Sequence, residues 1–235
     1  ALATLRRSRE MLSRELGLDP GRELVELEGA MLRQDPSLSA ATALPRPVAR
    51  CPYPGLLPYD VDDAEFFFGR DADLAVCRRR LAESGVLVLV GPSGSGKSSL
   101  LRAGLVASLA DEGVPCTIVA TGAPEDELLA EIEEGDAESV LVLDQVEEVM
   151  ARLASPTQRV RLAEALLGCG GRRRLALAIR ADRFGDLAEV PGFASLAERG
   201  LVLLGPLDEG ALRDAIEGPA REAVLLLEPG MVDVL

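Results

Sequence analysis

The chain has 235 residues, 48% of them hydrophobic, and a formal net charge of −14 at pH 7. This length allows one sizeable α/β core with a smaller unit beside it, and the acidic charge argues against direct binding of a nucleic-acid backbone. Because the sequence contains no histidine, a Ser-His or Cys-His nucleophile and a His-ligated metal are excluded. No signal-peptide pattern opens the chain and no apolar run approaches the ~18 residues of a membrane span, so we expect a cytoplasmic protein without a membrane partner.

The residues before position 39 predict two short amphipathic helices that form a hairpin. Two such helices do not make an independent core, so we expect this segment to be the end of a larger unit. Six prolines between Asp35 and Pro58 prevent regular structure, which predicts a linker and then an extended segment. The apolar positions that define the helices are Leu2, Leu5, Leu12 and Leu16 in the first, and Leu24, Leu27, Met31 and Leu32 in the second.

After the linker, apolar runs alternate with helical patterns. A continuous run such as Val86–Val90 suits a strand that is buried on both faces. The alternation predicts an α/β fold with a five-stranded parallel sheet covered by helices on both faces. The tail, residues 208–235, predicts one helix, a break at Gly218-Pro219 and the start of further helix. The predicted strands are Val86–Val90, Cys116–Ala120, Val140–Leu143, Leu175–Ile179 and Leu201–Leu204, and the helices between them are Ser98–Ala110, Glu125–Glu133, Val146–Leu153 and Gln158–Leu167.

A glycine-rich loop, GPSGSGKS at residues 91–98, fits the pattern G-x-x-x-x-G-K-[ST] and lies between a buried strand and a helix. In that context, successive backbone N–H groups surround phosphate oxygens at the positive end of the helix. Lys97 is the only lysine of the chain, and its compact ammonium reaches between two phosphates where a planar guanidinium would be bulkier. The Ser98 hydroxyl is expected to bind Mg²⁺. The predicted nucleotide-binding residues of the loop are Gly91, Ser93, Gly94, Ser95, Gly96, Lys97, Ser98 and Ser99.

An acidic cluster follows the third predicted strand. Asp144, at the end of that strand, is in position to hold Mg²⁺ through its water shell. One or both of Glu147 and Glu148 would orient or deprotonate the attacking water, and we assign this role to Glu147. The alternative is that these two residues are ordinary acidic residues at a helix N-terminus.

Arg180 follows the fourth predicted strand and is expected at the same sheet edge as the glycine-rich loop, because ligands of open α/β sheets bind at the carboxyl ends of the strands. There it would sense the γ-phosphate, although an ordinary surface arginine is the alternative. A GTPase needs an N-K-x-D element to read its base, and the only lysine is already in the loop. We therefore expect ATP and ADP as ligands.

These segments together resemble the STAND class of signal-transduction ATPases, and most closely its bacterial novel STAND branch. The resemblance runs from Cys51 to about Leu235. The motifs that carry it are CPYPGLLPYDVDDAEFFFGRD, GPSGSGKSSLLRAGL, VLVLDQVEEV, LALAIRADRFGDL and GPLDEGALRDAIEGPA. It implies that Gly69 and Arg70 lie near the nucleotide and that Pro219, in a helical lid, contacts adenine. It also supports the metal-binding, hydrolytic and sensor roles assigned above to Asp144, Glu147 and Arg180.

The first segment, LSRELGLDPGRELVELEGAMLRQDPSL, is similar to the end of the bacterial transcriptional activator domain, a helical-repeat module. In such proteins this module usually follows a winged-helix DNA-binding domain. The resemblance implies that this protein contacts DNA only through a domain outside the present chain.

The domain organisation that follows has four parts: helices of an activator domain in residues 1–38, a linker in 39–50, a P-loop NTPase domain in 51–204, and the start of a helical lid in 205–235. We expect a molecular switch that binds ATP·Mg²⁺ and hydrolyses it slowly within a bacterial regulator. Its partners would be further copies of the protein or the other domains of the full-length protein. The alternatives are a kinase-like phosphotransferase that acts on a small molecule, and an interaction scaffold with a degenerate site.

Overall fold

The computed structural model describes residues 29, 32–33, 50–135, 137–153, 155–228 and 230–232. The chain forms two units, residues 1–49 and residues 50–235. The predicted N-terminal helices lie almost entirely outside the described residues, and so does most of the predicted linker. None of the described helices combines the length and the apolar character that a membrane span requires.

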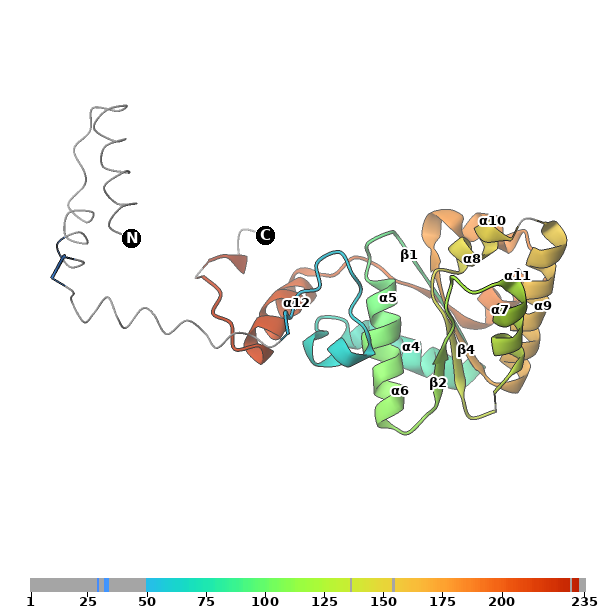
Figure 1. Ribbon diagram of the computed structural model, residues 1–235, viewed down its shortest axis with the longest axis horizontal. Coiled ribbons are helices and arrows are strands. Elements are labelled where there is room, and N and C mark those ends of the chain that lie inside the picture. The colour runs from blue at the N-terminus through green and yellow to red at the C-terminus, as the bar shows by residue number, and fades with distance from the viewer. Residues whose placement is uncertain are drawn as a thin grey trace, which may run out of the picture. The chain divides into compact units, whose positions relative to one another are not determined.

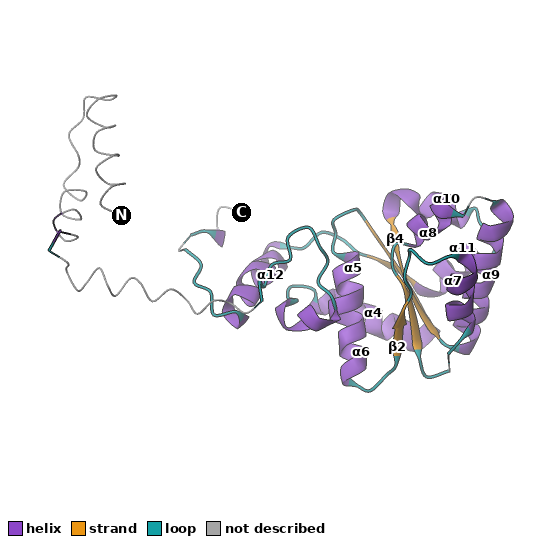
Figure 2. Cartoon of the chain, viewed as in Figure 1, coloured by secondary structure: helices purple, strands orange, loops and turns teal. Residues whose placement is uncertain are grey.

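The second unit is built on a parallel sheet (Figure 2). The sheet has five strands in the order β2-β3-β4-β1-β5. The predicted sheet is therefore confirmed, with strand bounds that differ by at most two residues. Strand β4 pairs with both β1 and β3, so it separates the strand before the glycine-rich loop from the strand before Asp144. The strands are β1 (Val86–Gly91), β2 (Cys116–Ile118), β3 (Val140–Leu143), β4 (Arg174–Arg180) and β5 (Leu201–Leu203).

Helices cover both faces of the sheet because β1 and β3 are buried at every position and β4 at every position between its two terminal arginines (Figure 1). In β1 the valines face one core and the leucines face the other, and each fully buried side chain contributes about 1.5–3 kcal/mol relative to an exposed one. One face carries α4 (Asp71–Ser84) and the helix that follows the loop, residues 97–111. The helices on the other face are α7 (Glu125–Glu133), α8 (Val146–Arg152), α9 (Pro156–Arg172), α10 (Phe184–Ala188) and α11 (Phe193–Gly200).

The helix after the loop is predicted as one α-helix, but it winds in three parts. They are α5 (Lys97–Ser99), a π-helix (Leu100–Val106) and α6 (Ala107–Asp111). Gly104, inside the π-helix, lies against the side chains of Phe67 and Leu74. Single π turns occur frequently at functional sites.

A last helix, α12 (Glu209–Glu222), begins at Asp208, whose side chain accepts a hydrogen bond from the Ala211 N–H. The predicted break at Gly218-Pro219 is wrong, because the helix passes through Pro219 and the Ala223 N–H donates to the Pro219 carbonyl at 3.0 Å. Proline removes one N–H donor, but packing holds this turn. A Cβ at position 218 would lie 2.4 Å from the ring of Phe68, so only glycine allows the approach.

Candidate nucleotide-binding site

The glycine-rich loop turns sharply between β1 and α5. Gly94 and Gly96 have φ of +75° and +86°, values that glycine adopts without the steric cost borne by other residues. Gly96 immediately precedes α5, so the loop delivers its chain to the positive end of a helix. This is the local geometry that the loop sequence predicts for anion binding.

Lys97 turns back over the loop instead of extending into solvent. Its side chain is 9% exposed, and Nζ donates to the carbonyls of Gly91 at 3.0 Å and Pro92 at 2.7 Å. Burial lowers the pKa of Lys97 below its usual value, and the carboxylates of Glu147 and Asp144 oppose that shift. The single ammonium of the chain is thus held at the mouth of the loop, with two acidic side chains of the cavity close enough to influence it.

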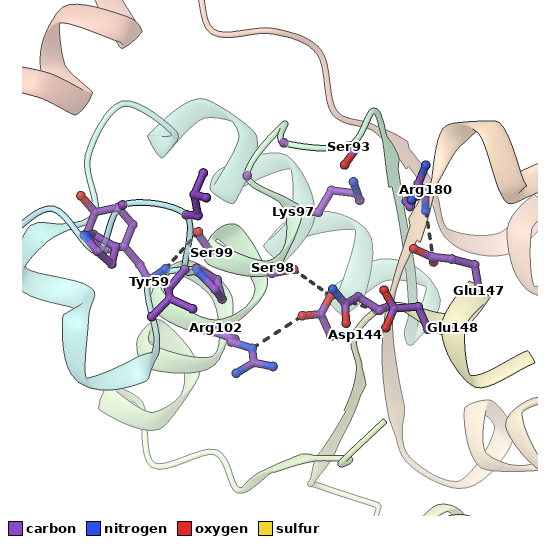
Figure 3. Close-up of a pocket in the computed structure, with 18 of the residues that line it drawn as sticks. Tyr59, Ser93, Lys97, Ser98, Ser99, Arg102, Asp144, Glu147, Glu148 and Arg180 are labelled. Carbon is purple, nitrogen blue, oxygen red and sulfur yellow. Dashed lines mark hydrogen bonds and ion pairs between the residues drawn. The ribbon is translucent and has the colours of Figure 1, made fainter. Parts of the chain in front are cut away.

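Asp144 and Ser98 meet across the sheet edge (Figure 3). Asp144 follows β3 and is 3% exposed, and its Oδ1 accepts from the Ser98 hydroxyl at 3.1 Å and from the Gln145 N–H at 3.0 Å. Gln145 has a φ of +50°, an uncommon conformation for a residue other than glycine. This backbone turn fixes the carboxylate at the carboxyl end of the strand.

One cavity of about 750 Å³ adjoins these groups. Among the predicted site residues, the structure brings together around it Asp144, Glu147, Arg180 and all of the loop except Gly91 and Ser95. Glu147 lies in the first turn of α8, and its Oε2 accepts a hydrogen bond from the Arg180 N–H at 3.2 Å. Glu148 also lines the cavity, so both acidic candidates line the same cavity as the loop. The predicted loop residues that line it are Ser93, Gly94, Gly96, Lys97, Ser98 and Ser99.

The guanidinium of Arg180 donates two hydrogen bonds to the carboxylate of Asp182. Nε lies 3.1 Å from one carboxylate oxygen and Nη2 lies 2.9 Å from the other. The hydrogen bond and the charge of Asp182 raise the pKa of Arg180, and those of Arg180 lower the pKa of Asp182. The pair is solvent-exposed, so it is a weak and readily broken contact.

Three residues that the family resemblance assigns to the nucleotide do not line the cavity. Arg70 is buried and does not line the cavity, but it contacts the loop: its Nη2 donates a hydrogen bond to the Ser95 carbonyl at 2.9 Å. Gly69 instead packs closely against α12. A Cβ added at this position would lie only 2.2 Å from the Ala211 carbonyl oxygen. Pro219 is buried within α12. The hydroxyl of Ser95 is also buried, without a hydrogen-bond partner in the part of the chain that the structure describes.

Sequence reasoning missed one wall of the cavity. This wall is residues 53–59, and its backbone is held to the loop helix where the Tyr59 N–H donates to the Ser99 hydroxyl at 3.1 Å. It also missed Arg102, whose Nε lies 3.6 Å from Asp144 Oδ2 (Figure 3). The signal for Arg102 was its spacing, because a residue four after Ser98 falls on the same face of a helix.

The donor set fits a nucleotide with a hard cation. The Ser98 hydroxyl and the Asp144 carboxylate supply oxygen, the ligand type that Mg²⁺ takes in phosphate-binding sites. Beside them, the loop amides and the Lys97 ammonium supply positive charge for phosphates. A parallel sheet with this loop after β1 and a buried aspartate after β3 defines a P-loop NTPase.

A comparison with family models gives the particular family. The model of the family described as Novel STAND NTPase 1 matches residues 52–235, and the chain belongs to this family. The resemblance seen in the sequence motifs is thereby confirmed.

Among curated proteins, the chain is similar to the regulatory protein AfsR of Streptomyces griseus, with 36% identity over 105 residues. That match covers 43% of this chain and 10% of AfsR, so the chain spans only a small part of that relative.

Among solved structures, domain III of the replication initiation protein DnaA of Thermotoga maritima aligns with a TM-score of 0.54 and 14% identity. The alignment covers 75% of this chain and 79% of that one. AMPPCP-bound DnaA of Aquifex aeolicus aligns with a TM-score of 0.52 and 17% identity, and here 77% and 60% of the two chains are covered. At these identities the two alignments establish a shared fold.

Proposed function

We propose that this chain is the nucleotide switch of a bacterial transcriptional regulator, which binds ATP·Mg²⁺, hydrolyses it slowly and changes state with the bound nucleotide. The observation that carries the proposal is the convergence of Lys97, Ser98 and Asp144 at one sheet edge, with Glu147 beside them. These groups provide a phosphate cradle, a cation site and a base within one cavity.

Each residue then has a defined part. Lys97 would exchange its bonds to the loop carbonyls for bonds to phosphate oxygens, while Ser98 and Asp144 would hold Mg²⁺, which neutralises charge on the phosphates. Glu147 would orient the attacking water and accept its proton. Arg180, released from Asp182, would contact the γ-phosphate.

The contacts around Glu147 support a switch. In this structure Glu147 accepts from the Arg180 N–H, and Asp182 holds the side chain of Arg180. A γ-phosphate would compete for both groups, so its presence is coupled to a rearrangement at the end of β4. To move a switch from almost entirely off to almost entirely on, the ligand must favour one state by about 5.5 kcal/mol.

The setting in a regulator is supported by the similarity to AfsR and by the first segment, which is similar to an activator domain. ATP is favoured by the same fold in a DnaA that is bound to AMPPCP. We propose a cytoplasmic protein in which residues 205–235 begin a helical lid. DNA would be bound by a different domain, since the net charge of this chain is −14.

Thermal unfolding tests the binding step. At a hundred times Kd, ATP·Mg²⁺ should stabilise the folded chain by about 2.7 kcal/mol, which raises Tm by roughly 5–10 °C. A melting curve that does not respond to nucleotide would contradict the proposal.

Glu147→Gln tests hydrolysis. It should leave binding intact and slow phosphate release about 10²- to 10⁴-fold, because the amide keeps an oxygen for the Arg180 N–H but is no base. Glu148→Gln is the matched control and should hydrolyse at the wild-type rate. Hydrolysis by Glu147→Gln at the wild-type rate would remove Glu147 from the mechanism. Phosphate release that requires an added acceptor would favour the phosphotransferase.

A further inference from the structure

Arg102 lies between two carboxylates that belong to different parts of the site. It is in the π-helix Leu100–Val106 and lines the cavity. Its Nη1 donates to Asp60 Oδ2 at 3.3 Å, and its Nε lies 3.6 Å from Asp144 Oδ2. One guanidinium therefore touches both Asp144, at the end of β3, and Asp60, which directly follows the opposite wall. Figure 3 shows the contact with Asp144.

The contact with Asp144 is incomplete. At 3.6 Å it is an ion pair and too long for a hydrogen bond, and the buried Nε has no hydrogen-bond partner among the described residues. Arg102 is thus held near Asp144 by charge, without the directional bond that would lock it there. A buried aspartate needs a positive neighbour, and Arg102 provides one in this arrangement.

A divalent cation bound by Ser98 and Asp144 would compete with Arg102 for the same carboxylate. Two positive groups within a few ångströms repel each other strongly in a partly buried site. Because the guanidinium of Arg102 also holds Asp60, its withdrawal from Asp144 changes the contact with Asp60 in the same event.

Asp60 ends a segment, residues 53–60, which we call the strap. The two oxygens of the Asp60 carboxylate have different partners: Oδ1 accepts a hydrogen bond from the Val61 N–H at 2.8 Å, and Oδ2 accepts one from Arg102. At its other end the strap reaches α12, where the Tyr53 hydroxyl donates to the Ile216 carbonyl. A change at Asp60 is therefore passed to a segment that touches both the cavity and the last helix.

We propose that Arg102 is a positioning residue that couples the cation site to the strap: cation binding at Ser98 and Asp144 displaces Arg102 and thereby changes how the strap is held. The inference rests on the proposed function, because it requires a bound nucleotide and cation.

The composition of the chain supplies a direct readout. The sequence has no tryptophan and two tyrosines, Tyr53 and Tyr59, both of which lie in the strap. Intrinsic tyrosine emission therefore reports the strap alone. The experiment saturates the full chain with AMPPCP in a metal-free buffer and then titrates Mg²⁺, so that nucleotide absorbance stays constant.

In the wild type, Mg²⁺ should change the tyrosine emission with a saturable dependence. In Arg102→Gln the emission change should be lost. The half-saturating Mg²⁺ concentration, measured by calorimetry, should fall about two- to fivefold, because the guanidinium no longer competes with Mg²⁺ for Asp144. Asp60→Asn keeps an oxygen for the Val61 N–H but loses the charge, so it too should flatten the emission change. It provides the same test if Arg102→Gln does not fold.

Arg161→Gln is the matched control. It removes an ion pair of similar length, 3.5 Å to Glu125, between helices of the other sheet face, and should respond as the wild type. A wild type that binds AMPPCP without an emission response to Mg²⁺ would overturn the inference, as would an unchanged response in Arg102→Gln. A wild type that does not bind AMPPCP would instead overturn the proposed function.

Discussion

The two walls of the cavity differ in how the chain builds them. On the sheet side, Asp144 directly follows the buried strand β3, and the glycine-rich loop that carries Lys97 and Ser98 starts at the end of the buried strand β1, so the parallel register of the sheet brings these groups to one edge. On the other side, the strap has exposed leucines at positions 56 and 57 and is attached through hydrogen bonds of Tyr53, Tyr59 and Asp60.

The difference indicates that one wall is rigid and the other can move. The sheet edge resists movement, because shifting it would disturb two hydrophobic clusters, whereas each polar contact of the strap contributes only about 0.5–1.5 kcal/mol. The proposed switch would have to hold phosphates in a fixed geometry and also report their presence, and one fixed wall with one adjustable wall would serve both needs. Each of the following experiments tests one side of this comparison.

The largest effect is expected on the fixed wall. Lys97→Ala should weaken ATP·Mg²⁺ binding by about 2–3 kcal/mol, roughly 30- to 150-fold in Kd, because charge-assisted hydrogen bonds to phosphate are lost. Calorimetry measures the change, and melting without nucleotide checks the fold. Lys97→Arg is the control for charge, and it should also bind less tightly, because a planar fork replaces the compact ammonium. An unchanged Kd in Lys97→Ala would separate the fixed wall from phosphate binding.

On the adjustable side, Gly69→Ala tests how α12 is attached. The added Cβ meets the Ala211 carbonyl oxygen at 2.2 Å and the φ at this glycine is +82°, so we expect a loss of about 2 kcal/mol and a Tm lower by roughly 4–8 °C. Gly113→Ala is matched, since its φ is +75° and nothing lies within 4 Å of the added atom. Equal losses in both variants would show that backbone conformation, and not the contact with α12, sets the cost.

The smallest effect compares a buried thiol of α4, the helix that packs on the sheet, with an exposed thiol beside the strap. Burial raises the pKa of Cys77 to about 12 from an ordinary 9.0, while Cys51 is exposed. The native state then keeps a proton that the unfolded chain releases, so this stability is present below pH 9.0 and is lost as the pH rises toward 12.

Between about pH 8 and pH 10 the wild type should therefore lose about 1 kcal/mol more than Cys77→Ala, as measured by urea unfolding. Cys51→Ala should follow the wild type over the same range. The same pH dependence in all three proteins would mean that Cys77 ionises as freely in the folded chain as in the unfolded one.

Much of the fixed wall is predictable because it depends on short-range patterns. Val86–Val90 and Val140–Leu143 are continuous apolar runs, and such runs are strands wherever helices cover both faces. The glycine-rich loop follows the first run, and Asp144 follows the second. Both runs lead to the same edge because their strands are parallel. The roles of Glu147 and Arg180 remain predictions that the experiments above test.

The adjustable wall was not predictable because its contacts join positions far apart in sequence. Proline patterns gave residues 51–58 an extended form, but nothing in them indicates that Tyr53 bonds to Ile216 or that Tyr59 bonds to Ser99. The predicted break at Pro219 failed for a related reason. A local preference for a helix end is overridden by the packing of Gly218 against Phe68.

By itself, the sequence determined the sheet, the phosphate loop and the position of the buried aspartate, because periodic burial and glycine-rich turns act over a few residues. Tertiary structure alone decided that Arg102 lies between Asp60 and Asp144 and that α12 packs on residues 66–70. Such contacts join charges and small residues that are far apart in the sequence, and no local sequence pattern indicates which of them meet in the folded chain.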